Sequence, residues 1–256
     1  MINIALSGAL GKMGRVIAEL VSARSDCRTV AGADVQIATN VGQSATFPVY
    51  KKVFDIKENI DVIIDFSHSS ALPDLLTYCK MKEIPLVAAT TGYSEGEISE
   101  IKKAAAQIPI FFTGNMSLGI NLLQDLSRRA ARVLGEQFDI EIIERHHNLK
   151  KDAPSGTAYM LFDSINDEFG NKKYPVHNRN GDLKARKSNE IGMHAIRGGT
   201  IVGEHEIAFA GHDEVITLTH SALSKEVFAV GAINAAVFLK SQPKGLYDMS
   251  NLLSSI

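Results

Sequence analysis

The residues best suited to chemistry lie close together in the segment 141–158, EIIERHHNLKKDAPSGTA. Two adjacent histidines, His146 and His147, are followed by two lysines, Lys150 and Lys151. Histidine and lysine side chains can donate a proton to a reacting group, and cations stabilise negative charge that develops beside them. Because the whole chain has a formal net charge of −2, this local excess of cations indicates a site for a small anion.

The end of the same segment, residues 154–157, predicts the start of a helix. Ser155 or Asp152 could cap that helix, and the free N–H groups at a helix start bind a carboxylate well. Cations beside a helix start therefore predict a site for a small acid with several negative charges. The alternatives are a solvated basic loop and a metal site at the paired histidines. No metal is predicted, because no second set of Cys, His or carboxylate residues stands at ligand spacing.

A glycine-rich turn follows the first apolar run of the chain. Glycines at positions 8, 11 and 14 allow a tight turn and close approach of the backbone to a pyrophosphate. The usual fingerprint is G-x-G-x-x-G, and a leucine stands here in place of its middle glycine, so an ordinary strand-to-helix turn is the alternative. The residues of this turn expected to contact a nucleotide are Gly8, Ala9, Leu10, Gly11, Lys12 and Met13.

Asp34 closes the second predicted strand. A carboxylate at this place can accept hydrogen bonds from the ribose hydroxyls of an adenosine, and the alternative is a solvated strand end. The next residue is Val35, so no adjacent cation would neutralise the 2′-phosphate of NADPH. We therefore predict that NADH is used at least as well as NADPH, unless Lys51 or Lys52 folds over the site.

Two further loops follow predicted strands of the same sheet. Cofactors lie across the carboxyl ends of parallel strands, so both loops are expected to line the nicotinamide half of the site. Taken alone, either could be a loop without function. The residues are Ala89, Thr90 and Thr91 in the first loop, and Thr113, Gly114, Asn115 and Met116 in the second.

The elements that must position these loops alternate between strand and helix in the first half of the chain. The run 61–67, DVIIDFS, is nearly continuously apolar, as expected for a parallel strand covered on both faces. The alternation predicts an α/β fold with a doubly wound parallel sheet. Strands are predicted over 2–7, 28–34, 61–67, 84–89 and 108–113, and helices over 15–24, 71–82 and 95–107.

The pattern changes near Gly114 and predicts a second, α+β domain. A polar stretch over 171–188 predicts an excursion on the surface. A last apolar helix over 227–240 could return to the first domain. Helices are also predicted over 118–134 and 157–169, and strands over 138–144, 193–197, 200–210 and 214–221, the last two joined as a hairpin.

Composition excludes several classes of protein. The 256 residues are 45% hydrophobic and 22% charged, as in soluble globular proteins. The net charge does not favour nucleic acid or an anionic membrane, and no apolar run approaches the roughly 20 residues that span a bilayer. No basic stretch precedes the N-terminal apolar run, so no secretion signal is predicted. Cys27 and Cys79 lack metal-like spacing and are expected to be buried thiols. We expect a cytoplasmic protein that acts on small molecules.

The segment 141–158 resembles the signature of the 4-hydroxy-tetrahydrodipicolinate reductase family, E-[IV]-x-E-x-H-x(3)-K-x-D-x-P-S-G-T-A, at every fixed position. The resemblance covers nearly the whole chain. It includes the GxxGxMGR turn, the TTG loop, the NxSxG stretch, RGGTIVGEH, THSALSK and GLYDM. It implies a Rossmann-like doubly wound sheet plus a smaller α+β domain with a mixed sheet. The domain bounds are then 1–116 with 226–256 for the dinucleotide, and 117–225 for substrate binding and oligomerisation.

The resemblance also implies an activity. This is reduction of (2S,4S)-4-hydroxy-2,3,4,5-tetrahydrodipicolinate with hydride from NAD(P)H and loss of water, in lysine and diaminopimelate biosynthesis. It implies that His146 is a proton donor or acceptor, that Lys150 donates a proton, and that the enzyme is a homotetramer. The implied substrate contacts are His147, Ser155, Gly156 and Thr157.

Three positions depart from the family pattern. Many relatives have glycine where Ala89 stands, Met116 replaces a common phenylalanine, and Lys225 stands where an arginine is usual. A single ammonium cannot make the two-pronged pair of a guanidinium with a carboxylate. Three alternatives stay open: another two-domain dehydrogenase, a nucleotide-sensing protein that has lost catalysis, and a plant reductase-like enzyme with another substrate. A sensor should have lost His146 or Lys150, and the chain keeps both.

Overall fold

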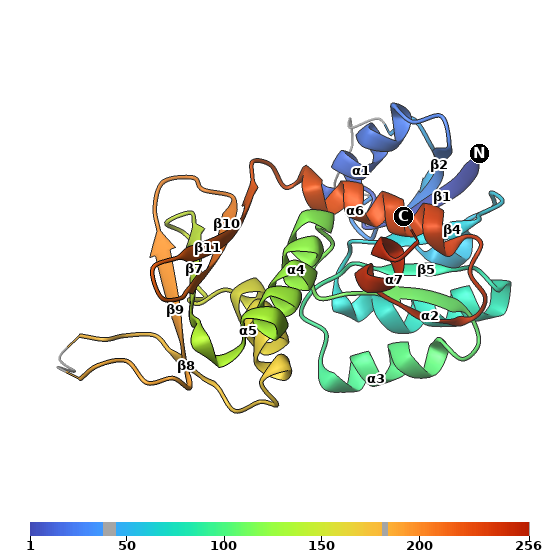
Figure 1. Cartoon of the computed structure of the whole chain (residues 1–256). Helices are drawn as coiled ribbons and strands as arrows, with labels where there is room; N and C mark the ends of the chain where they lie inside the picture. The colour runs from blue at the N-terminus through green and yellow to red at the C-terminus, as the bar shows by residue number, and fades with distance from the viewer. Residues whose placement is uncertain (38–44, 181–183, 256) are drawn as a thin grey trace. The chain divides into compact units, whose positions relative to one another are not determined.

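Six strands of the first half of the chain and one strand near its C-terminus pair into one seven-stranded parallel sheet (Figure 1). The computed structural model describes residues 1–37, 45–180 and 184–255. The strand order β12-β6-β5-β4-β1-β2-β3 reverses at β1, and ligands of such sheets bind at this switch point. The strands are β1 (Ile2–Ser7), β2 (Cys27–Ala33), β3 (Val49–Tyr50), β4 (Val62–Asp65), β5 (Leu86–Ala88), β6 (Pro109–Phe112) and β12 (Gly245–Tyr247).

Helices cover both faces of this sheet, which is why its strands are apolar on both sides. Ile64 of β4 packs in one cluster with Ile17 of α1 and Ala232 of α6. Its neighbour Ile63 packs in the opposite cluster with Leu75 of α2. The helices are α1 (Lys12–Ser22), α2 (Leu72–Lys82), α3 (Glu95–Ala104), α6 (Glu226–Leu239) and α7 (Met249–Leu253), with single 3-10 turns at Val53–Asp55 and Ser69–Ala71.

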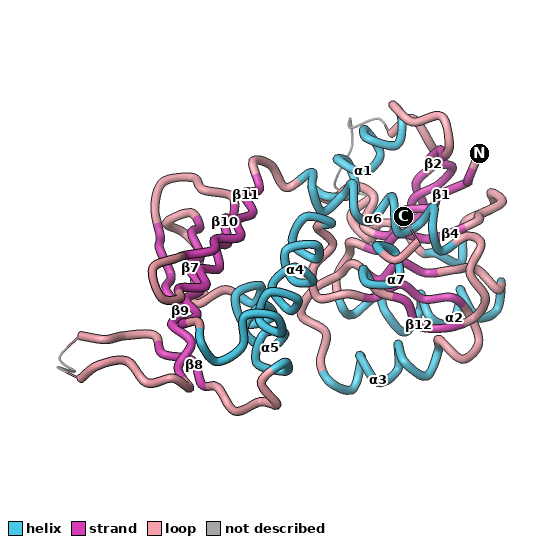
Figure 2. The backbone as a smooth tube through the Cα atoms, viewed as in Figure 1, coloured by secondary structure: helices cyan, strands magenta, loops and turns pink. Residues whose placement is uncertain are grey.

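A second sheet has five strands in the order β11-β10-β7-β9-β8 (Figure 2). β10 is antiparallel to β7 and β11, whereas β9 is parallel to β7 and β8, so the sheet is mixed. One face packs on α4 and α5 through side chains such as Ile142, Ile207 and Leu161. The elements are α4 (Leu118–Leu134), a 3-10 turn (Gly135–Gln137), β7 (Asp139–His146), α5 (Gly156–Glu168), β8 (Tyr174–Val176), β9 (Glu190–Arg197), β10 (Gly203–Ala210) and β11 (Val215–Ala222).

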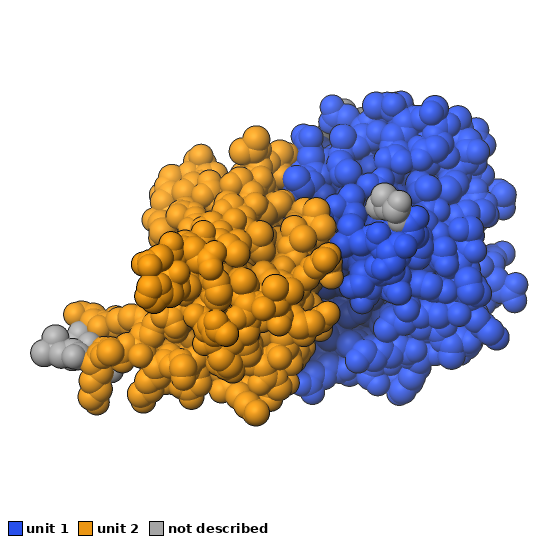
Figure 3. Space-filling view, in the orientation of Figure 1, with its two compact units in different colours: residues 1–118, 226–256 blue, residues 119–225 orange. Residues whose placement is uncertain are grey.

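The chain divides into two compact units (Figure 3). Unit 1 comprises Met1–Leu118 and Glu226–Ile256, and unit 2 comprises Gly119–Lys225. The predicted fold class, a doubly wound parallel sheet plus a domain with a mixed sheet, is confirmed.

Several predicted bounds are corrected by the structure. Helix α1 begins at Lys12, directly after the glycine turn, and not at residue 15. The polar excursion over 171–188 contains the strand β8, and its residues 181–183 lie outside the described part of the chain. Strand β7 continues to His146, two residues beyond its predicted end.

Candidate active site

The glycine turn after β1 brings backbone against backbone. Gly8 has a φ of +77°, and a Cβ there would lie 2.7 Å from the carbonyl oxygen of Phe66. A Cβ on Gly14 would lie 2.3 Å from the carbonyl oxygen of Gly8. The first N–H groups of α1, like those of any helix, have no intrahelical acceptor. The N-cap residue is Gly11, which has no side chain to accept from them. The turn therefore offers donors at a place that side chains cannot fill, as pyrophosphate binding requires.

Asp34 fixes the other side of this turn. Its Oδ2 accepts a hydrogen bond from the Leu10 N–H at 2.9 Å, and its Oδ1 accepts one from the Gln36 N–H at 2.9 Å. Each carboxylate oxygen can accept a second hydrogen bond, so the group can still bind ribose hydroxyls. Leu10 does not have a positive φ, so the backbone conformation at this position does not require glycine.

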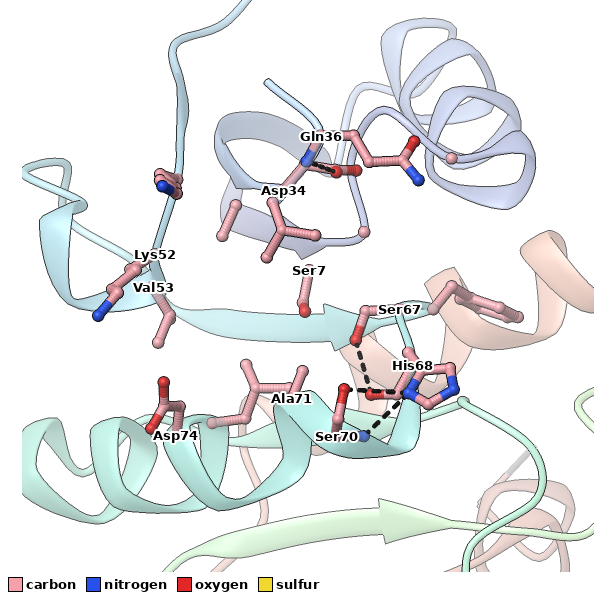
Figure 4. A pocket seen from close by; sticks show the side chains of 17 residues that line it. Ser7, Asp34, Gln36, Lys52, Val53, Ser67, His68, Ser70, Ala71 and Asp74 are labelled. Atoms are coloured by element: carbon pink, nitrogen blue, oxygen red, sulfur yellow. Dashed lines mark hydrogen bonds between the residues drawn. The ribbon is translucent and has the colours of Figure 1, made fainter. Parts of the chain in front are cut away.

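A cavity of about 390 Å³ opens beside Asp34 (Figure 4). Its volume falls within the ~300–1,000 Å³ of small-molecule sites. It lies at the switch point, since its walls come from the ends of β1 and β2 and from the loop after β4. Lys51 and Lys52 line the same cavity, although Figure 4 shows the Lys52 ammonium directed away from Asp34. Both cations that could reverse the predicted preference for NADH are thus close to the site.

The loops after β4 and β5 are joined by one buried carboxylate, Asp65, which is 1% exposed. It accepts hydrogen bonds from the hydroxyls of Ser67 at 2.5 Å, Thr90 at 2.7 Å and Tyr93 at 3.1 Å. Its carbonyl oxygen also accepts from the Ala89 N–H. Burial, and then the charge of Asp65, raise the pKa of the Tyr93 phenol. Asp65 was not predicted as a site residue, because strand-end carboxylates are common.

The loop after β6 folds on itself. The Thr113 hydroxyl donates to the Asn115 carbonyl at 3.4 Å, and the Asn115 side chain accepts from the Ser117 N–H at 2.9 Å. Met116 is 5% exposed and packs in the core with α1 and α6. Its side chain therefore contributes to the core of unit 1, while Thr91 of the preceding loop is exposed.

In unit 2, strand β7 carries a buried acid, Glu144, that side chains and backbone of several elements bind. Side chains of a strand alternate between faces, so Glu144 and His146 share the face of the buried Ile142. Glu144 is 0% exposed and lies 2.5 Å from Nδ1 of His146. Arg197 donates two hydrogen bonds to the same carboxylate, at 2.8 and 2.7 Å, and the Ser155 N–H donates a third at 3.0 Å.

These donors decide the charge of Glu144. Burial would raise the pKa of the carboxyl, but the hydrogen bonds and charges of Arg197 and His146 outweigh it, so the pKa is lowered. Arg197 and Glu144 were both within matched stretches of sequence, but the analysis gave neither a role. Their pairing across the parallel β7–β9 register could not be read from one sequence.

The start of α5 is capped by Ser155 and not by Asp152. The Ser155 hydroxyl accepts from the Ala158 N–H at 3.2 Å. Asp152 instead pairs with Lys150 at 2.9 Å, and this hydrogen bond lowers the pKa of the Asp152 carboxyl. Gly156 is exposed at the helix start, and no heavy atom lies within 4 Å of the position of a Cβ. The helix start is therefore exposed at Gly156, whose backbone donates to the Asp152 carboxylate.

Lys150 belongs to the same network as His146. Its side chain is 23% exposed, and its ammonium bonds to Asp152, whose carbonyl oxygen accepts from Arg197 at 2.7 Å. His147, the first residue after β7, and Thr157 are each half-buried. The structure thus brings together at one end of the mixed sheet the predicted proton-transferring groups and the helix start.

His205 is a buried histidine that the sequence analysis gave no role. It is 4% exposed, its Nε2 lies 3.2 Å from the Ser155 hydroxyl, and its ring is 5.3 Å from that of His146 in an edge-to-face arrangement. Burial, and then the charge of His146, lower the pKa of His205 to about 4. The sequence pattern that could have predicted its burial is the alternation of His205 with Ile207 and Phe209, which places all three on the core face of β10.

We expect His205 to make stability depend on pH between about 6.5 and about 4. Below 6.5 the unfolded chain binds a proton at this ring while the folded protein does not, so the free energy of unfolding falls as the pH falls. The full loss is up to about 3 kcal/mol. Urea unfolding at several pH values should show a shallower pH dependence for His205→Gln than for wild type. His212→Gln, at a side chain 95% exposed, is the control and should keep the wild-type slope.

Among the residues that the structure describes, no group of three or more His, Cys, Asp or Glu side chains is arranged to hold a metal ion. No helix in this part of the chain is both long enough and apolar enough to cross a membrane.

Both halves of the chain match protein-family models. The model described as "Dihydrodipicolinate reductase, N-terminus" matches residues 2–116, and "Dihydrodipicolinate reductase, C-terminus" matches residues 119–253. A curated 4-hydroxy-tetrahydrodipicolinate reductase from Caldanaerobacter subterraneus subsp. tengcongensis is 50% identical over 253 residues, 99% of this chain and 98% of that protein. One from Clostridium tetani is 45% identical over 255 residues, 100% of this chain and 98% of that protein.

A solved structure is similar along the same length. Dipicolinate-bound dihydrodipicolinate reductase from Paenisporosarcina sp. TG-14 aligns with a TM-score of 0.78 at 25% identity and covers 97% of each chain.

Proposed function

This chain belongs to the dihydrodipicolinate reductase family, and from that premise we propose the reaction that it catalyses. The reaction is reduction of (2S,4S)-4-hydroxy-2,3,4,5-tetrahydrodipicolinate to tetrahydrodipicolinate with loss of water, in lysine and diaminopimelate biosynthesis. The observation that carries the proposal is the network that joins Lys150, Asp152, Arg197, Glu144 and His146 at one end of the mixed sheet. The dipicolinate bound to the similar structure is a cyclic dicarboxylate of the same class.

Unit 1 is proposed to bind NADH or NADPH, with NADH at least as effective. The close-packed glycine turn, the free N–H groups at the start of α1 and the carboxylate of Asp34 fit a dinucleotide. When bound, the nicotinamide supplies the hydride that reduces the ring at C4. The proposed contacts are residues 8–13, Asp34, and the loops 89–91 and 113–116.

Unit 2 is proposed to hold the substrate and move the proton. Loss of water from the substrate gives a conjugated ring, and its reduction at C4 drives electrons toward the ring nitrogen. Lys150 or His146 then protonates the enamine, and the surrounding cations stabilise its developing charge. His147, Ser155, Gly156 and Thr157 are proposed to hold the carboxylates.

The remaining assignments are proposals of the same kind. Residues 1–116 with 226–256 form the nucleotide domain, and 117–225 form the domain for substrate and assembly. The protein is proposed to be a cytoplasmic homotetramer. Light scattering of the purified chain would test the assembly directly.

The deciding assay uses enzymatically generated 4-hydroxy-tetrahydrodipicolinate and follows the absorbance of NADH and then of NADPH. Substrate-dependent oxidation is the expected result. Folded protein that binds nucleotide but oxidises neither cofactor would contradict the reductase proposal and favour a nucleotide-sensing protein.

The same assay tests the role of Asp34. Asp34→Asn removes the charge that repels a 2′-phosphate while it can still accept from the Leu10 N–H. We expect the ratio of kcat/KM for NADPH to that for NADH to rise by roughly tenfold, which corresponds to ~1.4 kcal/mol and is close to the ~1 kcal/mol of one charge pair ~4 Å apart in water. An unchanged ratio would assign the discrimination to Lys51 and Lys52 instead.

A further inference from the structure

We propose that Glu144 is a positioning residue that fixes His146 in the form with its proton on Nδ1 and with Nε2 facing the substrate. The proposal deepens the proposed function, because it rests on His146 taking part in proton transfer. It assigns a task to a buried acid that contacts neither reactant in that mechanism.

The hydrogen bond between the two side chains decides which nitrogen carries the proton. Glu144 is ionised and can only accept, so Nδ1 of His146 at 2.5 Å must be the donor. A neutral imidazole then has its lone pair on Nε2, and an imidazolium has its transferable proton there. Of the two ring nitrogens of His146, Nδ1 is the one that makes a hydrogen bond within the described part of the chain.

The carboxylate is itself held from two further elements. Arg197 of β9 binds both oxygens, and the Ser155 N–H at the start of α5 binds Oε1. A carboxylate with both oxygens occupied by these donors cannot rotate away from the ring. Because it also bonds to the start of α5, the same group sets the position of His146 and of the proposed carboxylate site.

The neighbouring strand leaves room for the free nitrogen. A Cβ at Gly203 on β10 would lie 3.1 Å from Nε2 of His146 and would press on the ring. Glycine at this position therefore leaves space beside the nitrogen that the mechanism needs. The hydrogen bond of Nδ1 to Glu144 and the space beside Nε2 therefore support the same orientation of the His146 ring, with Nε2 free for the substrate.

The first test is spectroscopic and does not depend on activity. Solid-state NMR of [¹⁵N]histidine-labelled protein at alkaline pH distinguishes protonated from bare ring nitrogens. Loss of one signal pair in His146→Gln identifies His146 among the eight histidines. We expect a protonated Nδ1 and a bare Nε2 in wild type. A wild-type ring with its proton on Nε2 would overturn the proposal, whatever the activity of any variant.

The second test uses Glu144→Gln, whose amide can donate to Nδ1 and so move the proton to Nε2. We expect that changed spectrum together with a kcat lowered by roughly 10²-fold, the lower end of general acid–base effects, and an unchanged KM for NADH. Glu206→Gln is the control, because Glu206 pairs with Arg145 at 3.2 Å on the other face of the same sheet. It should behave as wild type.

The outcomes separate this proposal from the proposed function. An active wild type whose Glu144→Gln variant keeps its kcat and its Nδ1 proton would overturn the positioning role alone. A wild type without reductase activity would contradict the proposed function, whatever the spectrum shows.

Discussion

Replacing Lys150 by alanine is expected to lower kcat by about 10²–10⁴-fold, the range for loss of a general acid. The side chain is 23% exposed and its ammonium bonds to Asp152, so the group is held near the protein surface, where it can reach a ligand. Because the change removes a group needed in the transition state, kcat should fall more than KM rises. Steady-state rates with saturating NADH measure the effect.

Lys151→Ala is the matched control for this variant. It removes the same charge from the next residue, which is exposed, and should leave kcat close to wild type. Equal losses in the two variants would mean that the segment acts only through its overall positive charge. Unchanged turnover in Lys150→Ala would show that another group donates the proton.

Gly14→Ala is expected to damage both stability and nucleotide binding. The added Cβ would lie 2.3 Å from the Gly8 carbonyl oxygen and 2.8 Å from Ala9 backbone atoms, none of which can move like a flexible side chain. Overpacking of this kind costs about 1–3 kcal/mol. Displacement of the turn should also break at least one charge-assisted N–H contact, which weakens NADH binding by roughly tenfold or more.

Urea unfolding and isothermal titration with NADH measure the two effects. Gly96→Ala is the control, because Gly96 lies in the exposed first turn of α3 and the nearest atom to its Cβ position is 3.9 Å away. That variant should be as stable as wild type or slightly more so. NADH affinity unchanged in Gly14→Ala would remove the turn from the binding site.

Periodicity in the sequence was enough to predict the two sheets and most of their helices. The same periodicity could have predicted a further residue of the candidate active site. Period two along β7 places Glu144 and His146 on the face of Ile142, so a buried acid beside the proposed catalytic histidine could have been predicted. The predicted strand over 138–144 ends before His146, since charged residues normally mark the end of a buried strand.

Contacts between distant residues could not be predicted in this way. Arg197 reaches Glu144 across 53 positions, and His205 reaches Ser155 across 50. Which polar side chains meet depends on strand order and register, and one sequence without relatives does not contain that information. The strands β3, β8 and β12 were missed for a related reason, because two or three residues are too few to show a period.

The discontinuity of unit 1 has a consequence for the growing polypeptide on the ribosome. Helix α6 covers Val62 and Ile64 of β4, yet it is synthesised only after all of unit 2. At about 5–20 residues per second, that delay is roughly 5–20 s. During this time α1 already packs on this face of the nascent parallel sheet, but the part that α6 buries stays exposed, and apolar surface of this kind recruits chaperones and promotes aggregation. Chains that stall before Glu226 would keep that part exposed and should be removed by quality control.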